Sequence, residues 1–141
     1  GVIMTVSRPI RLRDKWGAGY YGASRGSRTH NGVDFVYEPN EVVHSLVEGT
    51  VTKVGYAYAD DLSYRYVEVQ DGSGRYCRHF YVDPSVRVGC MVFVGTALGT
   101  AQDTGKRYPG IIPHIHFEVF ALAGKNRQYC DPLKYLAGDI S

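Results

Sequence analysis

Two of the five histidines lie two residues apart in the segment PHIHFEV, residues 113–119. Successive side chains of an extended strand point to opposite faces, so His114 and His116 share one face and Glu118 follows them on it. Two imidazoles with this spacing can converge on one metal ion. The pattern H-x-H is weak on its own, because ordinary strands also carry such pairs.

A histidine and a carboxylate lie four residues apart in THNGVDF, residues 29–35. If this segment is extended, His30, Gly32 and Asp34 lie on one face, and Gly32 leaves room for another group to approach the backbone. An imidazole and a carboxylate are suitable ligands for zinc. Asn-Gly is also a turn signal, so the alternative for Asp34 is an ordinary turn or capping residue.

The two segments together make a more selective pattern than either one alone. Two imidazoles and one carboxylate form a three-ligand set, which leaves the fourth tetrahedral position of zinc open, as catalytic zinc sites require. Two further histidines remain, His79 in CRHF and His44 in VVHSLV. The apolar neighbours of His44 favour a place in the core or at the rim of a sheet.

Short strands are the elements that must position these residues, because Val, Thr and Tyr recur in short runs separated by glycines. The expected strands are two within 41–54, one over 64–70, its hairpin partner over 75–82, two within 86–99 and one over 112–122. Asp-Gly-Ser-Gly at 71–74 predicts the hairpin turn, and only 132–137 resembles a helical turn. Loops are expected over 14–29 and 101–113. The fold class is mostly β, a single antiparallel domain with long loops flanking a cleft.

Composition indicates one globular domain of 141 residues, with 44% hydrophobic and 21% charged residues. No apolar run reaches the ~18 residues of a membrane span, and residues 1–13 lack the apolar core of a secretory signal. The net charge of +2 is too small to indicate nucleic-acid binding. The three cysteines form no C-x-x-C pair, which argues against a structural zinc knuckle and favours reduced thiols; one disulfide stays possible.

Basic residues are concentrated near the N-terminus. We divide the chain into a basic arm and loop, residues 1–28, and a domain, residues 29–141. The arm carries six basic residues against one acid, Asp14. Such an arm could favour an anionic surface, or it could be a solvated leader strand.

From 29 to 136 the sequence resembles the lysostaphin/LytM-type metallopeptidases. The resemblance rests on the H-x-x-x-D and H-x-H motifs, a histidine on the preceding strand, and the segments VRVGCMVFVGTALGTAQDTG and CDPLKYL. It implies that His30, Asp34 and His116 bind zinc. It also implies that His114 and His79 act in catalysis, although Cys77 stands where that family usually has tyrosine. A leukocyte chemotaxin with the same fold is also similar around FYVDP and lacks a histidine at the strand position.

The resemblance implies a zinc-dependent endopeptidase that cuts bacterial peptidoglycan at the cell wall, with Glu118 orienting a ligand or forming a salt bridge. We expect a monomer with no nucleic-acid partner and no membrane span, of phage or prophage origin and acting in lysis. One alternative is a catalytically inactive wall-binding or protein-interaction module that keeps the zinc site. A cupin-like oxygenase is a weaker alternative, because its glutamate follows the second histidine by about four residues and Glu118 follows His116 by two.

Overall fold

The computed structural model describes residues 8–140, which fold into short antiparallel strands. The strands are β1 (Ser24–Arg25), β2 (Arg28–Thr29), β3 (Val33–Val36), β4 (Val42–His44), β5 (Gly49–Tyr56), β6 (Arg65–Gln70), β7 (Tyr76–Phe80), β8 (Val82–Pro84), β9 (Met91–Val92), β10 (Ala97–Ala101), β11 (His114–Ala123) and β12 (Asn126–Cys130). A 3-10 turn, η1 (Thr104–Lys106), and one helix, α1 (Pro132–Leu136), complete the elements. The predicted mostly-β class is therefore confirmed.

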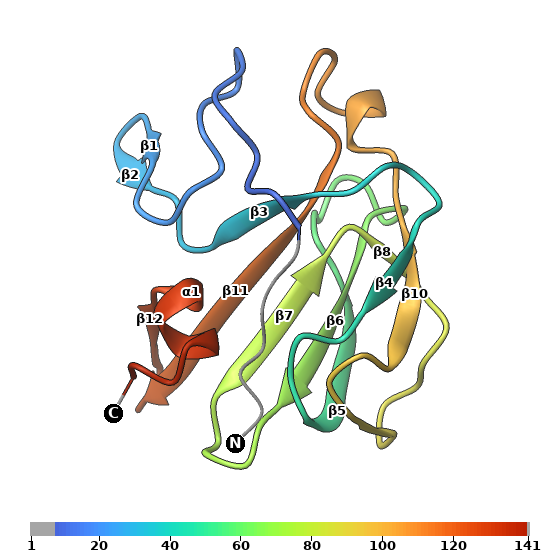
Figure 1. Cartoon of the computed structure of the whole chain (residues 1–141), viewed down its shortest axis with the longest axis vertical. Helices are drawn as coiled ribbons and strands as arrows, with labels where there is room; N and C mark the ends of the chain where they lie inside the picture. Colours follow the sequence, from blue (N-terminus) through green and yellow to red (C-terminus); the bar gives the residue numbers. More distant parts are fainter. Residues whose placement is uncertain (1–7, 141) are drawn as a thin grey trace.

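The main sheet has the order β12-β11-β7-β6-β5-β9 and curls into a half-barrel. β11 is its longest strand and pairs with β7 along one edge. The other edge of β11 is shared, because β3 pairs with its first half and β12 with its second half. A smaller sheet of order β4-β10-β8 lies beside the main one (Figure 1).

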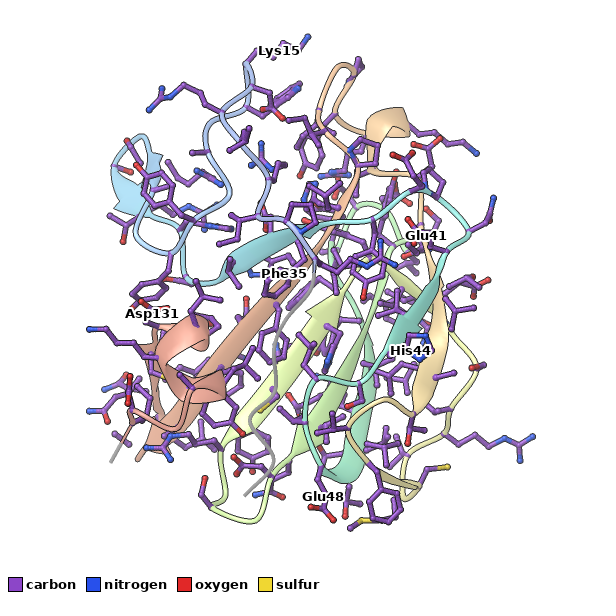
Figure 2. The ribbon with its side chains drawn as sticks, in the orientation of Figure 1. Lys15, Phe35, Glu41, His44, Glu48 and Asp131 are labelled. Carbon is purple, nitrogen blue, oxygen red and sulfur yellow. The ribbon has the colours of Figure 1, made fainter. Side chains whose placement is uncertain are left out.

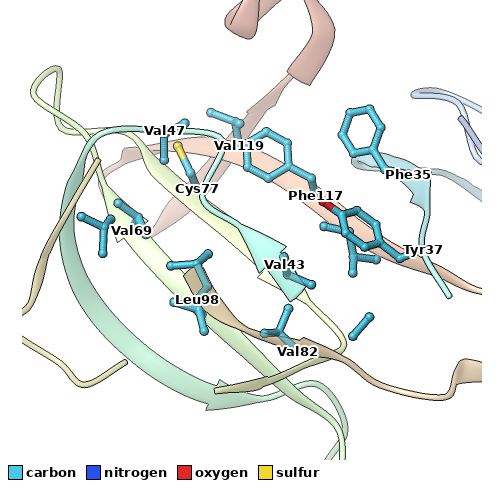
Figure 3. Close-up of a cluster of buried hydrophobic side chains, with 14 of the residues drawn as sticks. Phe35, Tyr37, Val43, Val47, Val69, Cys77, Val82, Leu98, Phe117 and Val119 are labelled. Carbon is cyan, nitrogen blue, oxygen red and sulfur yellow. The ribbon is translucent and has the colours of Figure 1, made fainter. Parts of the chain in front are cut away.

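The hydrophobic core fills the space between the two sheets (Figure 3). Phe117 and Val119 of β11 point into it together with Cys77 of β7, as strand alternation requires. Val43 and Leu98 close it from the smaller sheet, and all five side chains have no exposed surface. One face of β11 is therefore fixed as the core face, and the opposite face is left for His114, His116 and Glu118.

Local signals account for the turn after β6 and for the C-terminal helix. The side chain of Asp71 accepts hydrogen bonds from the N–H groups of Ser73 and Arg75, each at 2.9 Å, which closes the predicted hairpin turn. The carboxylate of Asp131 caps α1 by accepting from the N–H of Leu133 at 3.0 Å, with proline at the first helical position. Both predictions are confirmed.

Several strands were not expected from the sequence. Residues 14–29 were predicted as loop, but they contain the two-residue strands β1 and β2, which pair with each other. β12 was also missed, since its residues carry no apolar alternation and are held by pairing with β11. Such strands depend on a partner strand rather than on their own composition.

Within residues 8–140, no helix has the length and apolar character needed to cross a bilayer. All three cysteines are free, with Cys77 buried and Cys90 exposed.

His44 lies on the exposed side of β4, at the rim of the smaller sheet (Figure 2), and its Nδ1 donates to the carbonyl of Gly95 at 2.9 Å.

Candidate metal centre

The pairing of β3 with β11 brings the two metal-ligand motifs together. In their antiparallel register Asp34 lies directly opposite His116. Residues directly opposite in such a pair have side chains on the same face of the sheet. His30 precedes β3, and the backbone of its segment is held by the hydrogen bond from its N–H to the carbonyl of Ala23 at 2.8 Å.

The three predicted ligand side chains converge. Nδ1 of His116 lies 2.9 Å from Oδ1 of Asp34 and 3.0 Å from Nε2 of His30. Nε2 of His30 lies 3.2 Å from the same carboxylate oxygen. Ligand atoms bound to one tetrahedral zinc ion at ~2.0–2.1 Å stand about 3.3 Å apart, so these separations match a shared ion.

The hydrogen bonds around the two imidazoles fit a metal. Nδ1 of His30 donates to the carbonyl of Tyr20 at 3.0 Å, so its Nε2 presents a lone pair. Nε2 of His116 donates to Oε1 of Glu118 at 2.8 Å, so its Nδ1 presents a lone pair as well. Two nitrogen lone pairs and the carboxylate of Asp34 thus face one point. Such a point is suited to a cation.

The pKa directions reflect the same concentration of negative charge. Burial opposes ionisation of Asp34, but its close contacts with the ring nitrogens of His116 and His30 outweigh the effect of burial and hold the pKa of Asp34 well below its usual range. Burial likewise opposes protonation of His116, but the hydrogen bonds to Asp34 and Glu118 raise the pKa of His116 to about 9. Both pKa directions indicate that this point attracts positive charge.

Gly32 is required by the close approach of His116. A Cβ atom at this position would lie 2.7 Å from Cε1 of the His116 ring and 2.4 Å from the carbonyl oxygen of Phe117. Both distances are shorter than van der Waals contact, so any side chain would displace the imidazole. The expectation that Gly32 leaves space for another group is confirmed. The group that occupies this space is the imidazole of His116.

Glu118 contacts His116 directly, as the orienting role requires. Its carboxylate accepts from the ring nitrogen that faces away from Asp34, which fixes both the tautomer and the direction of the ring. Glu118 lies opposite Arg78 in the register of β7 and β11, and Arg78 pairs with Glu68 at 2.7 Å. The carboxylate that orients His116 therefore belongs to a row of alternating charges across three strands.

His114 lies at the edge of the same cluster. Its Nδ1 donates to the carbonyl of Ile112 at 2.8 Å, which leaves Nε2 without a proton and 3.7 Å from Oδ2 of Asp34. Burial lowers the pKa of His114 despite the nearby carboxylate of Asp34. His114 is thus a neutral imidazole with an available lone pair, lining the same cleft as the ligands.

His79 does not join this group, and the expectation that it acts beside the metal is wrong. In the registers of β7 it lies opposite Phe117 on one side and Val67 on the other, which are both core residues. The side chain is fully buried, and its Nε2 accepts from the N–H of Leu46 at 3.2 Å. Strand alternation turns Phe80, not His79, to the face of His116.

Tyr81 is the residue at the cleft that sequence reasoning missed. Alternation would send it to the core after Phe80, but its φ of 71° breaks the pattern, and both residues line the cleft. The ring packs edge-on against His114 with centroids 5.5 Å apart. A left-handed backbone at a bulky residue costs ~1–3 kcal/mol and is typical of functional positions. The only sequence signal was the similarity of FYVDP to the chemotaxin.

The cleft around the cluster has a volume of about 380 Å³ and aromatic walls. The hydroxyl of Tyr81 lies 2.8 Å from that of Tyr58, which lies 2.6 Å from that of Tyr108. The guanidinium of Arg107 stacks on Tyr58 at 3.6 Å. Trp16 of the N-terminal arm packs edge-on against Tyr108 at 5.2 Å and completes the wall.

Solved structures show the same fold. The catalytic domain of lysostaphin from Staphylococcus simulans superposes with a TM-score of 0.65 at 24% identity, covering 85% of this chain and 90% of that one. A zinc-containing peptidase from Vibrio cholerae superposes with a TM-score of 0.58 at 26% identity, covering 86% of this chain and 39% of that one. This chain spans 50% of lysostaphin in its solution structure.

Sequence comparison gives the family. Leukocyte cell-derived chemotaxin-2 from Mus musculus is 33% identical over 135 residues, covering 92% of this chain and 81% of that protein. The sequence model of peptidase family M23 matches residues 28–132, which include His30, Asp34, His114 and His116. The predicted resemblance to lysostaphin-type peptidases and to the chemotaxin is therefore confirmed, and this chain belongs to peptidase family M23.

Proposed function

We propose that this chain is a zinc-dependent endopeptidase that hydrolyses peptide bonds in the stem or cross-bridge of bacterial peptidoglycan. The observation that carries the proposal is the convergence of His30, Asp34 and His116 beside a neutral His114 in one cleft of an M23 chain. Three such ligands leave one coordination position for water or substrate. The peptide class comes from the family and the lysostaphin-like fold.

The residues of the cleft have different roles in hydrolysis. A bound zinc ion supplies Lewis acidity, which polarises a carbonyl and lowers the pKa of a water molecule toward ~7. Nε2 of His114 takes a proton from the attacking water and gives it to the leaving nitrogen. As the C–O bond forms, the C–N bond breaks; the new acid group gives up the second proton of the water, so the products are a carboxylate and a protonated amine.

Tyr81 takes the second polar role in place of His79. Burial raises the pKa of the Tyr81 phenol, so the hydroxyl stays protonated and is a hydrogen-bond donor. Its place beside His114 allows it to donate to the carbonyl oxygen as negative charge develops there. We further propose that the protein acts at the bacterial cell wall as a monomer; a phage or prophage origin remains a prediction.

A module that binds metal without cleaving peptides is the second candidate. It is favoured by one observation, the presence of a tyrosine where the expected second histidine would face the metal. Similarity to leukocyte cell-derived chemotaxin-2 is consistent with it.

Mass spectrometry of muropeptides separates the two candidates. Purified peptidoglycan is incubated with the zinc-loaded protein, with the His114→Ala variant, and with protein treated with a chelator. New amino termini that arise only with the zinc-loaded wild type support the endopeptidase. Zinc binding without new termini from any wall preparation, combined with co-sedimentation with walls, supports the binding module.

A further inference from the structure

Arg11 is a buried cation of the N-terminal arm, with only 2% of its surface exposed. The sequence offered a solvated leader strand as one interpretation of this arm, and for Arg11 it is wrong. The arm runs beside β3 (Figure 1), where the N–H of Arg11 donates to the carbonyl of Asp34 at 2.8 Å. The returning part of the arm closes the contact, since Gly19 donates to Arg11 at 3.0 Å and accepts from the N–H of Asp34 at 2.8 Å.

The packing of these three residues leaves no spare space. A Cβ atom on Gly19 would lie 2.8 Å from Cβ of Arg11 and 2.9 Å from Cβ of Asp34. The backbone of Arg11 is thus fixed relative to the backbone of the metal-binding aspartate. Its side chain therefore begins from a defined position beside Asp34.

The guanidinium of Arg11 holds one oxygen of Asp34. Nε lies 3.1 Å from Oδ2, while Oδ1 is the atom that faces His30 and His116. One carboxylate oxygen of Asp34 therefore accepts from Arg11, and the other faces the metal position. Rotation of the carboxylate would break the bond to Arg11, so Asp34 is held with a single oxygen toward the metal position.

Asp14 completes the arrangement and neutralises the charge of Arg11. Nη1 of Arg11 lies 2.8 Å from Oδ2 of Asp14 and 2.8 Å from the carbonyl oxygen of Gly17. Oδ2 of Asp14 also accepts from the N–H of Ile112 at 3.0 Å, two residues before His114. The Arg11–Asp14 pair has no net charge, so it can orient Asp34 without repelling a divalent cation.

We propose that Arg11 is a positioning residue of the metal centre, and that the N-terminal arm is part of that centre rather than an appendage to it. The inference rests on the metal site of the proposed function. It adds that the affinity for zinc depends on a guanidinium that never touches the ion. Residues that orient metal ligands typically contribute 10–100-fold to metal affinity.

The test is a zinc titration with a competing chelator, carried out on the full chain and on three variants. Arg11→Met keeps the aliphatic stem and removes the guanidinium. Arg11→Lys keeps the charge but replaces the planar fork, in which separate nitrogens bond Asp34 and Asp14, by a single ammonium group. Arg8→Met is the matched control, because Arg8 lies in the same arm and contacts Glu41 and Tyr37 but not Asp34.

We expect zinc to bind ~10–100-fold more weakly to Arg11→Met, somewhat less weakly to Arg11→Lys, and with wild-type affinity to Arg8→Met. Cobalt substitution gives a second readout, since its visible spectrum responds to ligand geometry and not to overall stability. The spectrum should change in the Arg11 variants and stay unchanged in Arg8→Met. If Arg11→Met does not fold, the zinc affinity of Arg11→Lys is compared with that of Arg8→Met, and this comparison tests the positioning role.

The outcomes separate this inference from the proposed function. Zinc affinities of both Arg11 variants within twofold of wild type, with the wild-type cobalt spectrum, would overturn the positioning role alone. Failure of the wild type to bind zinc would overturn the metal centre and this role with it. Tight, Arg11-dependent zinc binding without any peptidase activity would support the inference and leave the binding module as the function.

Discussion

The buried imidazole of His79 predicts how stability depends on pH. Burial lowers the pKa of His79 to about 4, against 6.5 for the free side chain. The unfolded chain therefore binds a proton at a higher pH than the folded chain does. The contribution of neutral His79 to stability is complete above pH 6.5 and is lost as the pH falls from 6.5 toward 4.

Linkage gives the size of this loss. The difference between the two pKa values corresponds to ~3 kcal/mol in the acid limit, of which ~2 kcal/mol is already lost at pH 5. His79→Gln removes the titrating group and keeps an acceptor for the N–H of Leu46. The variant should therefore lose ~2 kcal/mol less than the wild type between pH 7.5 and pH 5.

Urea unfolding in the presence of a chelator measures this difference in stability loss. For a typical dependence of unfolding free energy on urea, it corresponds to a shift of about 1 M in the urea midpoint. Burial also lowers the pKa of His114, but this residue is present in both proteins, so its contribution cancels in the comparison. Equal losses in the wild type and in His79→Gln would show that His79 titrates like an exposed histidine. Its assignment to the core would then be wrong.

Three further predictions concern the cleft. His116→Ala should abolish zinc binding, as measured by zinc titration. His114→Ala should keep zinc and lose hydrolysis, as measured by muropeptide analysis. Normal digestion by His114→Ala would contradict the proton-transfer role. Gly32→Ala should weaken zinc binding at least tenfold, because its Cβ would meet the His116 ring, while Gly72→Ala, at a turn with open space, should not. Tyr81→Phe should lower the rate of hydrolysis ~100-fold with unchanged zinc affinity, and an unchanged rate would exclude the hydroxyl as a donor.

The sequence by itself determined the class of fold and the set of side chains that could hold a metal ion. Strand composition, the turn at 71–74 and the capped helix could be predicted because each has a local signal: β-branched and aromatic residues, an Asp-Gly turn, and an Asp-Pro cap. The shared face of His114 and His116 is also local, because it follows from the period of a strand. The spacing in THNGVDF offered His30 and Asp34 as their partners, and the resemblance assigned His116 rather than His114 as the third ligand.

Only the tertiary structure decided which face of β7 meets the cluster of His30, Asp34 and His116. Alternation separates His79 from Phe80, but it does not say which of the two faces the core. That choice was made by pairing, which placed His79 between Phe117 and Val67. The left-handed backbone that brings Tyr81 into the cleft is likewise absent from any periodicity.

The role of Arg11 was also beyond the sequence. It lies 23 residues before Asp34, and no spacing rule connects a residue of the arm with a ligand on β3. The contact exists because Gly19 allows the arm to pass close to β3 on its return. Local patterns thus identified the groups able to bind a metal, whereas long-range packing decided which groups surround them.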